Sequence, residues 1–298
     1  MNSDRNCILS IDAGGTFIKA ALVCNNGILI KDSFINIPVE SDGKPENVKA
    51  AFIRVTSLGM EAAGKNNLIM TGIGVCIPGP FDYEKGISLM KHKYASIYGI
   101  SMRPWFEEVA GQVPVRFIHD STAFILGATW NSRYVQFKKI AGVIIGTGLG
   151  FASMFDSKVY SNPQGGPGIS IYSRPFRGKT AEEYVSRRAL IANYKKLVPE
   201  TKDEIDVIDI ANLARTGQTE AIRVFEEMGV YLSEILHDIL NDNMFECLLL
   251  GGAISKSADL FLPALKRGLS DVPALVVIEP VKDIDNVALL GIAKAMFE

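Results

Sequence analysis

The sequence has few cysteines and histidines, and none of them is spaced as a structural metal site. The four cysteines include no C-x-x-C pair, and the three histidines are scattered. This pattern excludes the usual zinc-binding arrangements. Because the cysteines lie within or at the end of apolar runs, we expect buried, reduced thiols rather than disulfides.

The chain also lacks a strong charge of either sign and any long apolar run. Its formal net charge is −2, without a basic block, so nucleic acid is not an expected partner. No apolar run reaches the length of a membrane span, and the polar residues 1–6 do not resemble a signal peptide. We therefore expect a cytoplasmic protein without a membrane segment, whose 298 residues suffice for two domains.

The most informative stretch is a glycine turn between two apolar runs near the start of the chain. It reads Ile11-Asp12-Ala13-Gly14-Gly15-Thr16-Phe17-Ile18-Lys19. Glycines permit a tight turn whose N–H groups face an anion, and the Asp12 carboxylate suits a hydrated Mg²⁺. Thr16 adds a hydroxyl donor. The pattern predicts a hairpin that holds the phosphates of a metal–nucleotide, and Lys19 either contacts phosphate or is an exposed strand residue.

A second stretch of the same kind occurs in the other half of the chain. It reads Ile145-Gly146-Thr147-Gly148-Leu149-Gly150-Phe151 and again consists of strand, glycine turn and strand. Internal similarity at a domain-sized offset suggests a duplication. We therefore expect one phosphate-binding hairpin in each half.

Hydrophobic patterns predict alternating strands and helices in both halves. Strands are expected at 7–11, 17–24, 28–35, 71–77, 115–118, 140–145, 151–155, 159–160, 247–250 and 274–278. Helices are expected at 47–63, 103–110, 121–131, 181–197, 218–240 and 286–296, and a loop or lid at 161–178. Hairpin-linked strands followed by strands alternating with helices are typical of a ribonuclease-H-like unit.

The predicted fold class is therefore α/β, with two ribonuclease-H-like (actin-like ATPase) domains and a cleft between them. We expect an N-terminal domain at 1–120 and a C-terminal domain at 121–285. The C-terminal helix at 286–298 is free to pack back on the first domain.

Five short motifs follow one another along nearly the whole chain. They are Asp12-Ala13-Gly14-Gly15-Thr16, Pro78-Gly79-Pro80-Phe81-Asp82, His119-Asp120, Gly146-Thr147-Gly148-Leu149-Gly150 and Gly251-Gly252-Ala253-Ile254-Ser255. In this combination the chain resembles the ROK family of sugar kinases, part of the actin and hexokinase superfamily, over about residues 7 to 297. The resemblance implies ATP-dependent phosphorylation of a hydroxyl of a hexose or a hexose derivative.

The resemblance also implies how ATP and magnesium are held. Asp12 would organise Mg²⁺, through water. The turns at 14–16 and 146–148 would hold the phosphates, and Gly251 and Gly252 would let adenosine lie close to the backbone. Thr16, Thr147 and Lys19 belong to this expected nucleotide site.

On the sugar side, Asp120 matches the family's catalytic aspartate, a general base that takes the proton of the sugar hydroxyl. Its structural alternative is to cap the helix that follows. Gly79, His119 and Glu182 match positions that line the sugar pocket, although Glu182 is also explained as an exposed first-turn glutamate.

Some family features are missing from the sequence. Members usually carry a G-E-x-G-H segment followed by zinc-binding cysteines, but residues 165–179 contain neither histidine nor cysteine, so we expect no structural zinc. His119 stands where asparagine is usual, and residues 91–98 replace a loop that normally carries asparagine. The sugar and the phosphorylated hydroxyl are therefore left open.

Two other functions remain as alternatives. One is a sugar-sensing relative with weak turnover, and the other is an actin-like or Hsp70-like ATPase without a sugar substrate. The family's repressors carry an N-terminal helix-turn-helix, for which the hairpin at residue 12 leaves no room, and the retained Asp120 favours turnover. Related kinases are often homodimers, and the apolar helices suit an interface and a core equally well.

Overall fold

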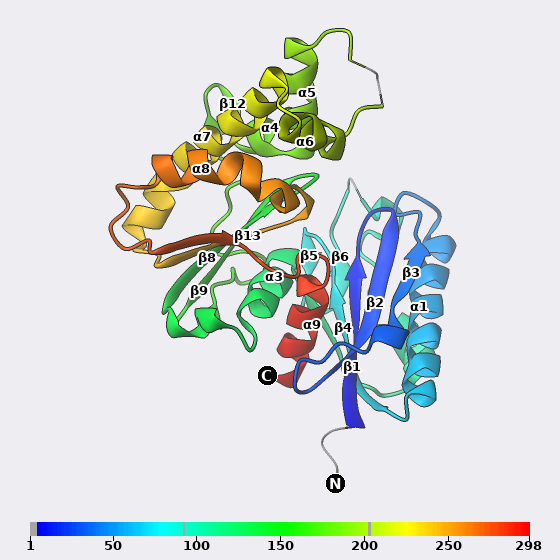
Figure 1. The fold of residues 1–298 in the computed structure, drawn as a ribbon. Helices are drawn as coiled ribbons and strands as arrows, with labels where there is room; N and C mark the ends of the chain where they lie inside the picture. Colours follow the sequence, from blue (N-terminus) through cyan, green and yellow to red (C-terminus); the bar gives the residue numbers. More distant parts are fainter. Residues whose placement is uncertain (1–4, 92, 202–203) are drawn as a thin grey trace. The chain divides into compact units, whose positions relative to one another are not determined.

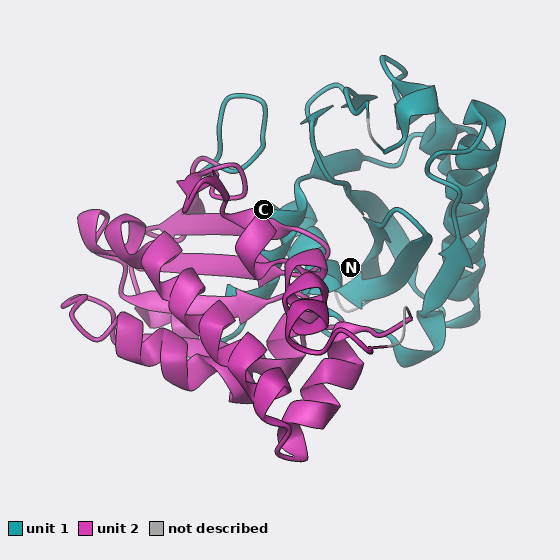
Figure 2. Cartoon of the chain, turned by 90° about the horizontal axis from the view of Figure 1, so that it is seen from above, with its two compact units in different colours: residues 1–133, 161–167, 286–298 teal, residues 134–160, 168–285 magenta. Residues whose placement is uncertain are grey.

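A computed structural model describes residues 5–91, 93–201 and 204–298 (Figure 1). The chain divides into two compact units, which are coloured in Figure 2. Unit 1 comprises the described residues up to Arg133, together with Ser161–Pro167 and Asn286–Glu298, and unit 2 comprises Tyr134–Tyr160 and Gly168–Asp285. This division differs from the boundary expected at residue 120, because residues 121–133 and 161–167 belong to unit 1.

Unit 1 is built on a five-stranded sheet in the order β3-β2-β1-β4-β7. Its strands are β1 (Asn6–Ala13), β2 (Phe17–Cys24), β3 (Ile35–Pro38), β4 (Ile69–Cys76) and β7 (Val115–Ile118). The strands β1, β2 and β3 pair antiparallel, whereas β1, β4 and β7 pair parallel. The strand β1 is central and is buried on both faces, as expected for its nearly continuous apolar sequence.

Helices cover both faces of this sheet. They are α1 (Pro45–Lys65), α2 (Arg103–Ala110), α3 (Asp120–Thr129) and α9 (Val287–Phe297). Alternate residues of β1 point to opposite faces: Leu9 packs in the cluster that contains Phe52 of α1, and Ile8 packs against Ala293 of α9. The last helix in the sequence therefore completes the core of the first unit.

The helices α3 and α9 cross at two glycines. A Cβ atom added to Gly127 of α3 would lie 1.9 Å from the Val287 carbonyl oxygen, and one added to Gly291 of α9 would lie 1.7 Å from the Ala123 carbonyl oxygen. These distances are far below van der Waals contact, so the two backbones meet directly and neither position has room for a side chain.

Unit 2 repeats the sheet order of unit 1 as β10-β9-β8-β13-β14. Its strands are β8 (Lys139–Ile145), β9 (Leu149–Phe155), β10 (Lys158–Val159), β13 (Cys247–Gly251) and β14 (Val277–Pro280). Its helices are α4 (Glu182–Val185), α5 (Arg187–Leu197), α6 (Val207–Arg215), α7 (Thr219–Asp242) and α8 (Ala258–Gly268). The same succession of antiparallel and parallel pairs in both units supports the duplication and confirms the predicted α/β fold class.

Short elements complete the two units. They are the strand pairs β5 (Phe81–Asp82) with β6 (Ile87–Ser88) and β11 (Pro175–Phe176) with β12 (Lys179–Thr180), and the 3₁₀ helices η2 (Lys31–Ser33), η3 (Ala95–Ile97), η4 (Arg133–Gln136) and η5 (Ala253–Ser257). The segment expected as a single loop at 161–178 thus contains β11 and is divided between the two units.

Some elements of the structure differ from the predicted ones. The strand expected at 28–35 is largely replaced by η2, because the Leu22 N–H donates to the Ser33 hydroxyl (2.8 Å) rather than to a strand backbone. The helix expected at 181–197 is interrupted at Ser186, whose extended backbone begins α5. The helices α6 and α8 were not predicted, although Asp206 and Asp209 form a capping box at the start of α6.

Candidate functional site

The first glycine turn lies between β1 and β2, as predicted. The Gly14 N–H donates to the Phe17 carbonyl oxygen at 3.0 Å, and a Cβ on Gly14 would lie 2.8 Å from that oxygen. The Thr16 carbonyl accepts from the Val39 N–H at 2.9 Å. Within the described part of the chain, no acceptor takes the N–H of Gly15 or Thr16. The turn therefore offers two unused backbone donors, which suits an anion.

Asp12 is the second-last residue of β1. It is opposite Lys19 on β2 and Cys76 on β4. Burial, and to a smaller extent the negative charge of Asp120, raise its pKa to about 6 against the opposing effects of the Lys19 charge and a hydrogen bond with Cys76. The structure thus brings together Asp12, Lys19 and Asp120 in unit 1.

Because its pKa is raised, Asp12 should lower the unfolding free energy of the protein by an amount that depends on pH. A carboxyl whose pKa is raised by folding stabilises the folded chain while it is protonated, below about pH 4. That contribution is lost as the pH rises through about 6, at a cost of up to about 3 kcal/mol. We expect Asp12→Asn to be more stable than the natural chain at pH 8 and of similar stability at pH 4.

Urea denaturation in the presence of a chelator at both pH values measures this difference. A difference in unfolding free energy that is equal at pH 4 and pH 8 would contradict the expectation. Addition of Mg²⁺ should stabilise the natural chain at pH 8 and leave the variant unchanged, if Asp12 helps to hold the ion.

Asp120 is the first residue of α3, directly after His119, which occupies the N-cap position. The Ser121 N–H donates to Asp120 Oδ1 at 2.7 Å, and the His119 Nδ1–H donates to the same oxygen at 2.8 Å. Partial loss of solvation beside the neighbouring residues opposes ionisation of Asp120, but the hydrogen bonds from His119 and Ser121 and the charges of His119 and Lys93 together lower its pKa. Its side chain is 54% exposed, so the ionised carboxylate is accessible.

Gly79 lies beside the same histidine. A Cβ on Gly79 would lie 3.4 Å from the Tyr83 hydroxyl oxygen and 3.6 Å from His119 Cδ2. The rings of Tyr83 and His119 meet edge to face, with centroids 5.9 Å apart. The segment 161–167 also reaches this place, because a Cβ on Gly165 would lie 3.1 Å from Tyr83. Gly79 and His119 are therefore brought together, and Tyr83 joins them.

The second glycine turn lies in unit 2, between β8 and β9, and is partly occupied by a carboxylate. Glu182 Oε2 accepts the Leu149 N–H at 3.0 Å and would lie 2.6 Å from a Cβ on Gly148. The Gly146 N–H donates to the Gly148 carbonyl oxygen at 3.0 Å. The Glu182 carboxylate thus occupies the space left by the absence of a side chain at Gly148. The sequence did not predict this contact.

The glycine pair at the end of β13 serves the packing of the sheet. Gly252 has a φ of +82°, and a Cβ there would lie 2.4 Å from the Ile145 carbonyl oxygen. The Ser255 hydroxyl donates to the Gly251 carbonyl oxygen at 2.7 Å. The chain after β13 therefore passes directly against the end of β8, close to the second turn.

Sequence reasoning missed two residues next to the first turn, Lys93 and Tyr94. The Tyr94 hydroxyl donates to the Gly14 carbonyl oxygen at 2.5 Å, and the Lys93 side chain lies beside Gly15. Both belong to the segment 91–98, which was identified only as unlike the family pattern; His92 of that segment lies outside the described residues. A lysine followed by a tyrosine forms no sequence motif, so nothing in the sequence predicts these contacts.

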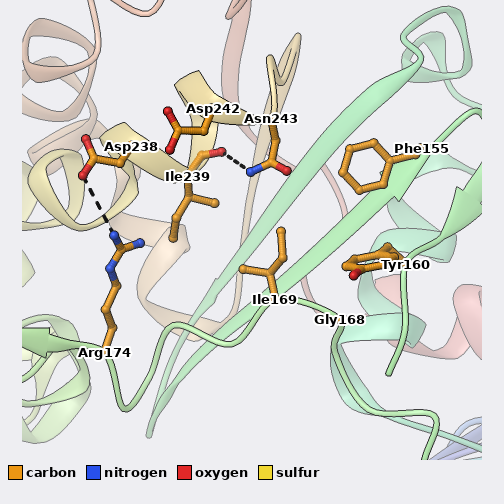
Figure 3. A pocket seen from close by; sticks show the side chains of 9 residues that line it. All are labelled: Phe155, Tyr160, Gly168, Ile169, Arg174, Asp238, Ile239, Asp242 and Asn243. Carbon is orange, nitrogen blue, oxygen red and sulfur yellow. Dashed lines mark hydrogen bonds and ion pairs between the residues drawn. The ribbon is translucent and has the colours of Figure 1, made fainter. Parts of the chain in front are cut away.

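A pocket of about 420 Å³ lies elsewhere, on unit 2 (Figure 3). It is lined by Phe155, Tyr160, Gly168, Ile169, Arg174, Asp238, Ile239, Asp242 and Asn243. Arg174 and Asp238 form an ion pair of 3.9 Å across part of it. None of the predicted site residues lines this pocket.

Within 5–91, 93–201 and 204–298, no group of three or more histidine, cysteine, aspartate or glutamate side chains is placed to hold a metal ion. No helix in the same part of the chain is both long and apolar enough to cross a membrane.

The repeated sheet order and the two turns define the ribonuclease-H-like fold, and comparison with known proteins gives the family. The chain belongs to the ROK family, whose model matches residues 8–294. It is 22% identical to the xylose repressor of Bacillus subtilis (strain 168), over 90% of this chain and 70% of the repressor. It is also 22% identical to the beta-glucoside kinase of Klebsiella pneumoniae, over 95% of this chain and 94% of the kinase.

A solved structure shares the fold. The ROK family glucokinase from Streptomyces griseus, crystallised in complex with glucose and AMPPNP, matches with a TM-score of 0.79 at 18% identity. The match covers 97% of this chain and 98% of the glucokinase. The relatives thus include both sugar kinases and repressors.

Proposed function

We propose that this chain is a kinase that transfers the γ-phosphoryl group of ATP to a hydroxyl of a sugar, with Asp120 as general base. The observation that carries the proposal is the ionised, accessible Asp120 carboxylate beside Asp12 and the unused donors of the first turn. The kinases among the relatives support the same class of reaction.

In this reaction Asp120 takes the proton of the attacking hydroxyl. The hydroxyl oxygen forms a bond to the γ-phosphorus while the bond from that phosphorus to the bridging oxygen of ADP breaks, and ADP leaves. Hydrogen bonds from His119 and Ser121 keep the Asp120 carboxylate ionised and oriented before transfer. Most of the catalysis then lies in positioning and in neutralising charge.

The residues of unit 1 fit a magnesium ion. Asp12 and Asp120 are carboxylates close enough for the charge of Asp120 to raise the pKa of Asp12, and this repulsion favours a divalent cation. Mg²⁺ uses one or two carboxylates and keeps several waters, so it does not require the larger ligand group that is absent from the described residues. When bound, the ion would neutralise phosphate charge, with Asp12 holding it through water.

The remaining assignments divide between nucleotide and sugar. Gly14, Gly15 and Thr16 offer donors to phosphate, Lys19 balances the charge of Asp12, and the turn at 146–148 is proposed to hold phosphate when Glu182 moves from it. Adenosine is proposed to lie against Gly251 and Gly252. Gly79, His119 and Glu182 are proposed to contact the sugar. We further propose a cytoplasmic location and leave both a monomer and a homodimer open.

One observation favours a second function, a sugar sensor with weak turnover. The Glu182 carboxylate accepts the Leu149 N–H at the second turn, so a phosphate there would have to displace a negative charge. The similarity to the xylose repressor of Bacillus subtilis supports this alternative as well.

An ADP-release assay distinguishes the functions. The protein is incubated with Mg-ATP and a panel of hexoses, amino sugars and ketoses. Release that depends on one sugar supports the kinase, and release without sugar supports an actin-like ATPase. Sugar binding by calorimetry without any ADP release would contradict the kinase and support the sensor.

A further inference from the structure

The loop at 93–98 is fixed to the first glycine turn by Tyr94. The Tyr94 side chain is fully buried, its ring centroid is 6.2 Å from that of Phe52, and its hydroxyl donates to the Gly14 carbonyl oxygen at 2.5 Å. Tyr94 also adopts a φ of +51°, in the left-handed region that aromatic residues rarely enter. Such a conformation persists only where surrounding contacts impose it, and it occurs often at functional sites.

The residue before it, Lys93, lies along the same turn. Its Cε and Cδ atoms are 3.6 and 3.8 Å from the position that a Cβ on Gly15 would occupy. The side chain is half-buried, and its positive charge acts on Asp120. Among the described residues, no carboxylate forms an ion pair with Lys93. The loop thus places the side chain of Lys93 beside the phosphate turn, where its unpaired charge also acts on Asp120.

We propose that Lys93 binds the γ-phosphate of ATP and neutralises its charge during transfer. This inference rests on the proposed function, in which the first turn holds phosphate and Asp120 accepts the proton. The γ-phosphoryl group must lie between those two elements, and a lysine acts there as a point charge. Lys19, the other lysine near this turn that acts on a site carboxylate, is instead paired with Asp12 across β1 and β2.

An anionic group on the sugar is the competing partner for Lys93. The position of the side chain favours phosphate, because its methylene groups lie on Gly15, whose N–H is one of the two unused donors of the turn. An ammonium group beside two unused backbone N–H groups of one turn is suited to a single phosphate.

The first test measures nucleotide binding without sugar. The dissociation constants of Mg-AMPPNP and Mg-ADP are determined by calorimetry for the natural chain, Lys93→Met and Lys93→Arg. Loss of a charged contact to the γ-phosphate should weaken AMPPNP binding by about tenfold to a hundredfold in Lys93→Met and change ADP binding less than about twofold. Lys93→Arg should recover most of the lost affinity.

The matched control is Lys91→Met, two residues before Lys93 in the sequence. Lys91 is exposed, and its ammonium group lies 5.6 Å from the centroid of the Tyr98 ring rather than at the turn. It should bind AMPPNP and ADP like the natural chain. Circular dichroism and melting of all variants establish that each is folded.

The second test uses the best sugar from the ADP-release assay. Lys93→Met should lower kcat by roughly 100-fold to 1,000-fold, with the KM for the sugar unchanged. A raised sugar KM with unchanged AMPPNP affinity would overturn the inference and assign Lys93 to the sugar. Equal loss of AMPPNP and ADP affinity, or no loss of either, would also overturn it.

The two proposals fail in different ways. If no sugar supports ADP release, the kinase proposal fails, while the ratio of AMPPNP to ADP affinity still decides the contact of Lys93. If the natural chain binds neither nucleotide, both proposals fail.

Discussion

Replacing Asp120 by asparagine should lower the kcat for sugar phosphorylation by about 100-fold to 10,000-fold. The asparagine side chain has the same shape, and its oxygen can still accept the Ser121 N–H that Asp120 accepts at 2.7 Å. The helix α3 should therefore form as before, and the affinity for AMPPNP should change little. What the variant loses is the ability to take a proton from the attacking hydroxyl.

The matched control for Asp120→Asn is Asp259→Asn. Asp259 also lies in the first turn of a helix, α8, and its pKa is lowered mainly by a hydrogen bond from Arg215. The same loss of a carboxylate at this place should leave kcat unchanged. Turnover by Asp120→Asn within a few fold of the natural chain would remove Asp120 as the general base and leave it a structural role at the start of α3.

A side chain at the crossing of α3 and α9 should destabilise unit 1 strongly. In Gly291→Ala the new methyl group would lie 1.7 Å from the Ala123 carbonyl oxygen, and in Gly127→Ala it would lie 1.9 Å from that of Val287. Both contacts are with backbone, which cannot rotate away as a side chain can. The helices must separate, and we expect each variant to lose at least about 3 kcal/mol of unfolding free energy.

Gly64→Ala is the control for this prediction. Gly64 lies in α1, and a Cβ there would meet nothing within 4 Å. Because alanine has the higher helix propensity, this variant should be unchanged or gain up to about 1 kcal/mol. Chemical denaturation followed by circular dichroism measures all three variants. Equal stability of Gly291→Ala and Gly64→Ala would show that the crossing tolerates a side chain.

Several elements were predicted to the residue. The strand β2 (Phe17–Cys24), the helix α2 (Arg103–Ala110) and the strand β7 (Val115–Ile118) have the predicted bounds. Each is apolar or amphipathic over its whole length and ends at glycine, proline or polar residues, so local sequence decides where it stops. The helix α8 was missed because Pro263 interrupts its pattern, although the helix continues through it.

The site was predictable only as far as its motifs extend. Asp12 and Asp120 were identified from sequence, and the structure brings them close together. The contacts of Lys93 with the first turn and of Glu182 with Gly148 were not predictable, because each joins segments far apart in the sequence. Such contacts depend on the three-dimensional positions of loops, which the hydrophobic periodicity and motif spacing of a sequence do not predict.

The position of α9 has a consequence for synthesis of the protein. All five strands of the unit 1 sheet are translated before residue 120. The helix that covers Ile8 and Val23 is translated only at residues 287–297. Every strand and helix of unit 2 is translated in the interval. Unit 2 can therefore fold before α9 is translated. Until then, unit 1 lacks this helix and one face of its sheet remains apolar and exposed. The nascent chain is thus most prone to aggregate, and most in need of a chaperone, at the stage when unit 2 is already complete.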